Sequence, residues 1–294
     1  MIRRVRVQLI LSGCVGGAIY ALFALGLTIL VRTMGMVNFA HGEFFMLGAF
    51  LVFLGLNVFR LSYGMSILLA LLGMALLGSL VYRTIFARLK AESHLSAVMA
   101  TIALSSFLKG VARVLWGQNV YPLPPLMSFH PVRFGSLVLT SQDVLIMGVV
   151  FFLLSWFFVL FARSQVGKAM EAVSQSLRGA SLVGMDVDGI LMSSWILAAS
   201  LGAISGILVA PMTLLFPDMG GVPLVKGFAA MVLGGFGNPV GAVVGAFVFG
   251  LAESLIGGYV STNLAELAPF VVVVFVLLLR PHGLLGRFES SRVG

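Results

Sequence analysis

The sequence is poor in charged residues. Only 10% of its 294 residues are Asp, Glu, Lys or Arg, and 60% are hydrophobic. Soluble domains instead carry about 25% charged residues and roughly 45–50% apolar residues. One soluble core cannot hide so much apolar surface, so the composition predicts a polytopic membrane protein. Residues 1–294 are expected to form a single transmembrane domain, because most of the length lies in apolar runs of spanning length.

The chain also has a single cysteine, Cys14, which excludes a disulfide framework and any Cys-rich metal site. The segment MIRRVRVQLILSGC that ends there looks like a lipoprotein signal. However, the apolar run continues without a polar break to Val31, and a run of that length suits a spanning helix better than a removed signal. We therefore interpret the first apolar segment as a transmembrane helix.

Motifs for nucleotide binding and catalysis are absent as well. The sequence has no P-loop, calcium-loop pattern, Rossmann fingerprint or Ser-His-Asp arrangement. Its apolar runs hold no convergent set of acid, base and nucleophile. The protein is therefore not expected to be an enzyme or to hold a cofactor, and any ATP that its function consumes would be hydrolysed by another chain.

Basic residues outnumber acidic ones and have a positional pattern. The formal net charge is +8, and nearly all Lys and Arg fall between apolar runs. That placement is typical of loops beside an anionic lipid leaflet, and it argues against nucleic-acid binding. By the positive-inside rule, residues 82–94, residues 162–168 and the C-terminal tail are predicted to be cytoplasmic.

Apolar runs of spanning length predict an all-α fold with about eight transmembrane helices. They cover residues 8–31, 38–59, 64–85, 95–117, 143–162, 189–211, 238–258 and 264–280. A further run, 224–236, would be about 20 Å long as a helix, too short for roughly 30 Å of hydrocarbon. It ends in the breaker cluster GGFGNP and predicts a broken or re-entrant helix.

The predicted sidedness leaves two questions open. Three full spans between the cytoplasmic loop at 163–188 and the cytoplasmic tail are an odd number, so 224–236 must either cross or dip in and return. Three spans before 82–94 place the N-terminus outside, although Arg3, Arg4 and Arg6 favour the inside. A helix break near RTMGMVNFAHG would reconcile both. The similarity of MVNFAHG to MVLGGFG suggests an internal inverted repeat.

Polar residues interrupt the second apolar run at Asn38, His41 and Glu43. A charge at the centre of a spanning helix costs about 2.5–3.5 kcal/mol, so Glu43 needs a partner or water. Two interpretations stay open: a position near the membrane interface, or a helix interruption beside a translocation path, where Gly42 permits close backbone approach. In the second, the facing group is Gly234, Gly235, Gly237 and Asn238.

The segment 162–190, ARSQVGKAMEAVSQSLRGASLVGMDVDGI, is the most informative stretch outside the apolar runs. Small apolar residues recur in it at helical spacing, and Gly184 supplies a turn before Asp186. This pattern predicts a cytoplasmic helix that docks into a cleft on a partner protein. An amphipathic helix that lies on the membrane surface is the alternative.

Four segments carry a family resemblance: GLTILVRTMGMVNFAHGEFFMLGAF, GKAMEAVSQSLRGASLVGMDVDGI, GFAAMVLGGFGNPVGAVVGAFVFGLAE and LRPHGLLGR. In this order they resemble the signature segments of LivH-type permeases of branched-chain amino acid ABC importers. The resemblance covers nearly the whole chain and implies a multi-pass protein of the bacterial inner membrane. The partners it implies are a second, LivM-like permease, two cytoplasmic ATPase subunits that hydrolyse the ATP, and a periplasmic substrate-binding protein.

The resemblance also implies that residues 163–188 form the coupling loop that contacts an ATPase. The candidate coupling residues are Glu171, Ala172, Ala180, Gly184 and Asp186. The expected cargo is a branched-chain amino acid or a related small polar solute, and urea, short amides and aromatic acids stay open. The alternative is a self-sufficient secondary transporter or channel that uses His41 and Glu43, although a channel would have no need of the 162–190 loop.

Overall fold

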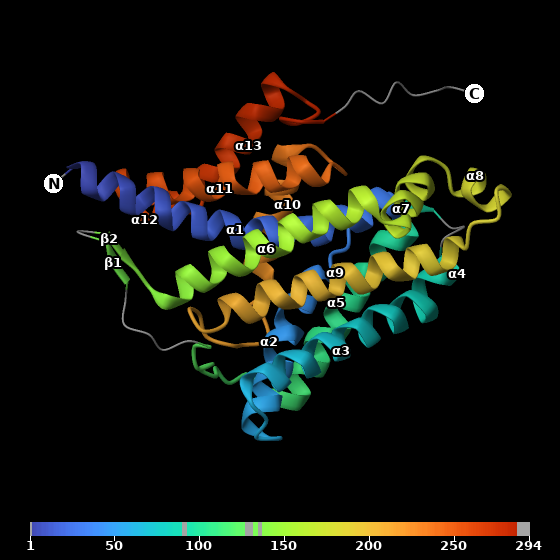
Figure 1. Ribbon diagram of the computed structural model, residues 1–294, viewed down its shortest axis with the longest axis horizontal. Helices are drawn as coiled ribbons and strands as arrows, with labels where there is room; N and C mark the ends of the chain where they lie inside the picture. Colours follow the sequence, from blue (N-terminus) through green and yellow to red (C-terminus); the bar gives the residue numbers. More distant parts are fainter. Residues whose placement is uncertain (1, 90–92, 127–131, 135–136, 287–294) are drawn as a thin grey trace.

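The computed structural model describes residues 2–89, 93–126, 132–134 and 137–286 (Figure 1). Its elements are α1 (Ile2–Met34), α2 (His41–Asn57), α3 (Tyr63–Val81), a π-helical turn (Tyr82–Phe86), α4 (Ala87–Leu89), α5 (His94–Trp116), β1 (Val132–Phe134), β2 (Leu137–Leu139), α6 (Ser141–Arg163), α7 (Gln165–Gln175), α8 (Leu177–Leu182), α9 (Val187–Val209), α10 (Gly221–Gly234), α11 (Pro239–Tyr259), α12 (Thr262–Ala265) and α13 (Ala268–Leu279). Apart from the small antiparallel hairpin β1–β2, the described part is helical, as predicted.

Each apolar run that the sequence analysis identified contains a helix, but the helices differ in length. Six described helices are long and apolar enough to cross a membrane: Arg6–Met34, Tyr63–Leu89, Leu95–Trp116, Ser141–Arg163, Val187–Val209 and Pro239–Tyr259. The apolar helices α2, α10 and the Phe270–Leu279 part of α13 are shorter. The protein is thus a multi-pass membrane protein, and the predicted count of about eight full spans is not confirmed.

A non-helical segment separates α1 from α2, at the place where the sequence predicted a helix interruption. Gly35 has a positive φ of 69°, which ends α1 at Met34. The side chain of Asn38 then accepts a hydrogen bond from the Ala40 backbone at 3.0 Å, a local turn that competes with helix formation. As a result α2 begins only at His41 and, with 17 residues, is about 26 Å long.

The short helix predicted at 224–236 is α10, whose 14 residues span about 21 Å. It ends at Gly235 and Gly237, both at positive φ. Asn238 then caps α11 by accepting hydrogen bonds from the backbone of Val240 and Gly241. The chain therefore turns back at 235–238, and α10 runs antiparallel to α11.

The helices α1–α3 and α9–α11 make corresponding packing contacts. Helix α1 packs along α11, and α9 packs along α3. Likewise α2 lies against α9 and α3, whereas α10 lies against α1 and α11. The contacts of Gly13 with Leu251 and of Gly17 with Phe247 show that α1 and α11 are antiparallel and closely packed, as small residues allow. Each helix of α1–α3 therefore has a counterpart in α9–α11.

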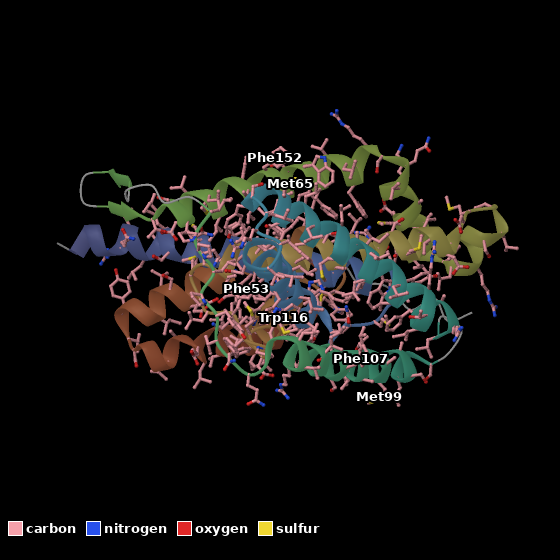
Figure 2. All side chains as sticks on the ribbon, turned by 90° about the horizontal axis from the view of Figure 1, so that it is seen from below. Phe53, Met65, Met99, Phe107, Trp116 and Phe152 are labelled. Carbon is pink, nitrogen blue, oxygen red and sulfur yellow. The ribbon has the colours of Figure 1, made fainter. Side chains whose placement is uncertain are left out.

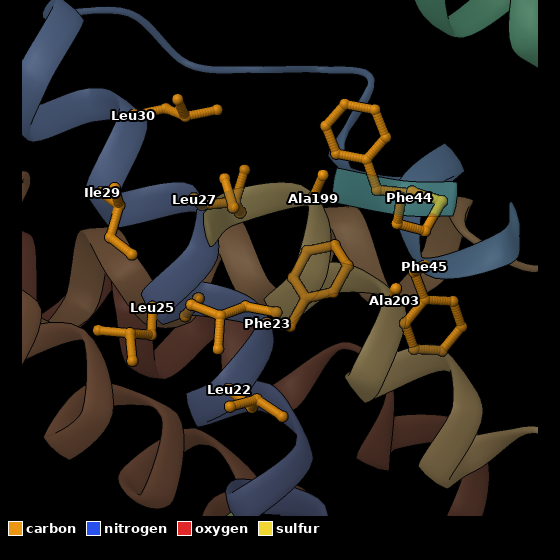
Figure 3. Close-up of a cluster of buried hydrophobic side chains, with 14 of the residues drawn as sticks. Leu22, Phe23, Leu25, Leu27, Ile29, Leu30, Phe44, Phe45, Ala199 and Ala203 are labelled. Atoms are coloured by element: carbon orange, nitrogen blue, oxygen red, sulfur yellow. The ribbon is translucent and has the colours of Figure 1, made fainter. Parts of the chain in front are cut away.

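The core lies where α1, α2 and α9 meet (Figure 3). Phe23 of α1 packs edge-on against Phe45 of α2, and Gly48 of α2 sits directly on Ala203 of α9. The outer surfaces of α3, α5 and α6 instead expose large apolar side chains, among them Met65, Met99, Phe107 and Phe152 (Figure 2). Such surfaces are expected where helices face lipid.

Two of the segments that were predicted to be cytoplasmic lie at one end of the molecule. Helices α4, α7 and α8 lie together there, whereas the start of α1 lies at the opposite end (Figure 1). Arg32, near the end of α1, forms an ion pair with Glu171 of α7 at 3.2 Å. The C-terminal end of α1 therefore lies on the same side as α7.

Candidate functional site

The starts of the two short helices α2 and α10 touch through their backbones at Gly42 and Gly220. A Cβ atom added at Gly42 would lie 2.5 Å from the carbonyl oxygen of Gly220, and one added at Gly220 would lie 2.5 Å from the carbonyl carbon of Gly42. Ordinary contact begins near 3.4 Å. Only glycine therefore fits at either position, and we call this contact the Gly42–Gly220 junction.

The junction lies deep within the helix assembly. The ring of His41, beside Gly42, packs edge-on against Phe23 with 4.6 Å between ring centroids, and it also contacts Gly26. Both partners belong to the interior of the long apolar helix α1. This placement favours the helix interruption over the interfacial interpretation of Asn38, His41 and Glu43.

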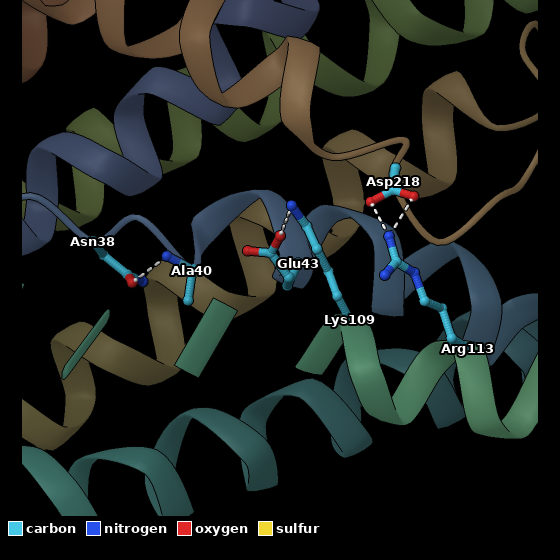
Figure 4. Close-up of polar contacts among 6 residues, drawn as sticks. All are labelled: Asn38, Ala40, Glu43, Lys109, Arg113 and Asp218. Carbon is cyan, nitrogen blue, oxygen red and sulfur yellow. Dashed lines mark hydrogen bonds and ion pairs between the residues drawn. The ribbon is translucent and has the colours of Figure 1, made fainter. Parts of the chain in front are cut away.

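Glu43 has a charged partner that sequence reasoning missed. Its side chain is only 2% exposed, and its Oε1 lies 3.3 Å from Nζ of Lys109 on α5 (Figure 4). The partner offsets the cost of a buried carboxylate, since an isolated charge in this environment is strongly destabilising. The second carboxylate oxygen, Oε2, has no hydrogen-bond partner among the described residues.

A second ion pair follows one turn later on α5. Arg113 holds both carboxylate oxygens of Asp218, at 2.9 and 3.0 Å, and both side chains are about half exposed. Asp218 precedes Gly220 by two residues, in the segment that connects α9 to α10. Backbone hydrogen bonds in both directions between Tyr121 and Leu215 tie this segment to the chain that follows α5. The pair is therefore well anchored beside the junction (Figure 4).

A cavity of about 270 Å³ opens beside the ion pair Arg113–Asp218, which we call the outer pair. Its lining residues are Arg113, Gln118, Val120, Phe216, Pro217 and Asp218. The lining thus combines two opposite charges with apolar surface. Such a mixture suits a small molecule that has a charged head and an apolar side chain.

Several buried polar atoms near the junction lack partners. The Nδ2 atom of Asn38 and both ring nitrogens of His41 make no hydrogen bond within the part of the chain that the structure describes. The Phe23 carbonyl lies beside the His41 ring but outside hydrogen-bond geometry. Each unsatisfied group costs about 1–3 kcal/mol. In native structures most buried polar atoms of this kind are satisfied by protein groups or by ordered water.

The glycine-rich group that was predicted to face Asn38, His41 and Glu43 lies away from the Gly42–Gly220 junction. Gly234, Gly235, Gly237 and Asn238 stand at the far end of α10, about 21 Å from Gly220 by helical rise. There they hold the C-terminal segment: Leu285 donates a hydrogen bond to Gly234 at 2.9 Å and accepts one from Asn238 at 2.8 Å. The structure therefore does not bring this group to face Asn38–Glu43, and Gly220 takes that place.

A further charged cluster ties α10 to α11 and α1. Lys226 of α10 forms an ion pair with Glu253 of α11, and the Tyr20 hydroxyl of α1 donates to the other oxygen of Glu253 at 2.9 Å. The ammonium group also lies 5.7 Å from the centre of the Tyr20 ring. This cluster was missed although Lys226 and Glu253 both interrupt apolar runs, which is the signal that singled out Glu43.

Helices α7 and α8 form the predicted coupling segment. Serine caps both: Ser164 accepts a hydrogen bond from Gly167, and Ser176 accepts one from Gly179. Glu171 is exposed and pairs with Arg32 of α1, whereas Ala172 is half-buried and Ala180 is buried. The small-residue face predicted for a partner thus packs partly on the protein itself.

The final turn of this segment exposes large apolar side chains. Gly184 has a φ of 81° and open space around it, and the two residues before it, Leu182 and Val183, are almost fully exposed. Asp186 is exposed and caps α9 by accepting a hydrogen bond from Gly189 at 3.0 Å. An apolar tip on a turn is the feature expected of a docking element, and the sequence analysis did not single out Leu182.

A family model and several curated relatives match nearly the whole chain. The model of the branched-chain amino acid transport system / permease component family matches residues 9–279. The high-affinity branched-chain amino acid transport system permease protein LivH of Escherichia coli (strain K12) is 30% identical over 97% of each chain. BraD of Pseudomonas aeruginosa, a permease protein described in the same terms, is 27% identical over 97% of each chain. A probable LivH of Methanocaldococcus jannaschii is 25% identical over 92% of this chain and 91% of its own.

Proposed function

Because the chain belongs to the family of branched-chain amino acid transport permease components, we propose that it is the transmembrane permease subunit of an ABC importer. Its cargo is a branched-chain amino acid or a related small polar solute, as the names of its relatives indicate. The relatives are transport permeases rather than enzymes. The energy comes from ATP that separate subunits hydrolyse.

The translocation path passes the Gly42–Gly220 junction, and this contact is the observation that carries the proposal. Two short helices start inside the protein there, and buried polar atoms and two ion pairs surround the contact. Transporters with inverted repeats place their sites where interrupted helices of the two halves meet. The corresponding packing of α1–α3 and α9–α11 supports such a repeat, with α2 and α10 as its interrupted elements.

ATPase docking takes place at α7 and α8. The exposed pair Leu182–Val183 offers an apolar tip, and the turn at Gly184 presents it. The ion pair between Arg32 and Glu171 links this segment to the end of α1, directly before the break that leads to His41. A movement of α7 can therefore reach the junction through α1 and the 35–40 segment.

The remaining partners follow from the family. A second, LivM-like permease completes the transmembrane unit, two ATPases bind at the cytoplasmic face, and a periplasmic binding protein delivers the solute. The assembly lies in the bacterial inner membrane. Outward-facing apolar side chains on α3 and α6 are consistent with direct contact with lipid.

Reconstitution tests the proposal. Liposomes that contain this chain with its partner permease, ATPases and binding protein should take up labelled L-leucine only when ATP is present. The chain alone should transport nothing, with or without a proton gradient. A gradient-driven flux through the chain alone that disappears in Glu43→Gln would instead identify a secondary transporter that uses Glu43 and His41.

A further inference from the structure

We propose that the ion pairs Arg113–Asp218 and Lys109–Glu43 are two successive subsites for a zwitterion. At each one, the carboxylate of the solute binds the cation on α5, and its ammonium group binds the acid on the opposite wall. This inference rests on the proposed function and deepens it, since it names the chemical class of the cargo and the residues that recognise it.

The two pairs have the same polarity and lie in sequence along one path. Lys109 and Arg113 are four residues apart on α5, so they share one helix face and are separated by about 6 Å along the axis. The acids lie opposite α5, Glu43 at the start of α2 and Asp218 in the segment before α10, and they flank the Gly42–Gly220 junction. Cations therefore form one wall and acids the other, so a zwitterion keeps its orientation as it moves (Figure 4).

Exposure falls from the first pair to the second. The side chains of Arg113 and Asp218 are 47% and 53% exposed, whereas those of Lys109 and Glu43 are 29% and 2% exposed. The outer pair borders the 270 Å³ cavity, whose wall also includes Val120, Phe216 and Pro217. This cavity can receive an aliphatic side chain while the two charges of the solute engage Arg113 and Asp218.

Ion-pair exchange keeps every charge compensated. Removing one partner of a buried ion pair leaves an uncompensated charge at high cost. A zwitterion placed between Lys109 and Glu43 gives each of them a new partner of opposite sign, whereas a simple anion or cation would satisfy only one. The free Oε2 atom of Glu43 can accept from the ammonium group before the contact with Lys109 breaks. The same exchange predicts discrimination against solutes that carry one charge.

The pair Lys226–Glu253 shows what a structural ion pair looks like in this protein. Its acid is held by a third group, the hydroxyl of Tyr20, and the ammonium group lies near the ring of the same tyrosine. The outer pair of the proposed subsites instead borders an open cavity. We therefore assign recognition to Arg113–Asp218 and Lys109–Glu43, and helix attachment to Lys226–Glu253.

Two double variants of the outer pair test the proposal in the complete reconstituted importer. Arg113→Gln with Asp218→Asn removes both charges and leaves neither unpaired. Arg113→Asp with Asp218→Arg keeps an ion pair but reverses its polarity, so that the solute would have to turn end over end within about 6 Å. Both variants should lower ATP-driven uptake of labelled L-leucine at least tenfold. ATP hydrolysis stimulated by the loaded binding protein should stay within twofold of wild type.

The outcomes distinguish a role of the ion pair in solute recognition from a purely structural role. Recovery of uptake in the polarity-reversed variant would show that the pair only clamps α5 to the α9–α10 segment, and the proposal would be overturned. Parallel loss of ATP hydrolysis and uptake in both variants would have the same meaning. Failure of the wild-type assembly to show ATP-driven uptake of any branched-chain amino acid or related small polar solute would refute the proposed function itself, before any variant is compared.

Discussion

Replacing Gly220 by alanine tests the junction through one methyl group. Gly220 has φ −78° and ψ −15°, a conformation that any L-residue adopts, so the substitution introduces no backbone strain. The added carbon would lie 2.5 Å from the carbonyl carbon of Gly42, whereas ordinary contact begins near 3.4 Å. The carbonyl oxygen of Gly42 would lie closer still, so the starts of α2 and α10 would have to separate by more than about 0.9 Å.

The free-energy cost of this separation depends on the atoms on both sides of the Gly42–Gly220 contact. Both walls are backbone, so neither can rotate away as a side chain would, and overpacking of this kind costs about 1–3 kcal/mol. Glu43 adjoins Gly42 and lies 3.3 Å from Lys109. A displacement of the start of α2 therefore also disturbs this ion pair, whose direct contact ends at roughly 4 Å.

The assay is ATP-driven uptake of labelled L-leucine by the complete importer, with the unfolding temperature measured in parallel. If the full penalty falls on the transporting state, uptake should drop about 5- to 150-fold, the range that corresponds to 1–3 kcal/mol. Gly221→Ala is the matched control. A Cβ atom at Gly221 meets nothing within 4 Å, so this variant should transport like wild type. Equal uptake by the two variants would refute a close functional contact at the junction.

Three further perturbations have defined outcomes. Gly184→Val should uncouple ATP hydrolysis from uptake, because a β-branched residue at a φ of 81° costs about 1–3 kcal/mol. Gly184→Asn should keep most activity. Normal coupling in the valine variant would exclude this turn from docking. Lys226→Met should lower the free energy of unfolding by about 3–5 kcal/mol, since it leaves Glu253 uncompensated. The addition of Glu253→Gln should recover much of that loss in a thermal unfolding experiment. An equal loss in both variants would contradict a buried pair. Asn38→Cys, in a chain that lacks Cys14, should react with a water-soluble thiol reagent at a rate that changes when the ATPases are trapped with nucleotide, and inertness in every state would place the 35–40 segment outside the path.

Features that depend on neighbouring residues were predictable from the sequence. The break between α1 and α2 follows from Gly35 and Asn38, which favour turns over helix. The short helix α10 follows from the breaker cluster beginning at Gly234. The need of Glu43 for a partner followed from the energetics of buried charge alone. Each of these inferences used information contained within a few residues of the chain.

The identity of contact partners was not predictable in the same way. Lys109 and Gly220 are far from Glu43 and Gly42 in sequence, so their meeting depends on how the helices pack. The weak similarity of MVNFAHG to MVLGGFG aligned the start of α2 with the end of α10, whereas the structure joins the two starts. Ala180 was assigned to a partner because it is small, yet it is buried in the protein itself.

The contact between the starts of α2 and α10 has an electrostatic consequence. The N-terminus of each helix carries a partial positive charge of roughly half an elementary charge, because its first amide groups point outward and their dipoles add. At the junction two such ends meet, while Lys109 and Arg113 offset Glu43 and Asp218. The local field is therefore net positive, and helix ends of this kind exclude protons and metal cations from aqueous pores. We therefore expect the proposed path to repel sodium ions and protons, whereas a zwitterion finds a partner for each of its charges at the two ion pairs.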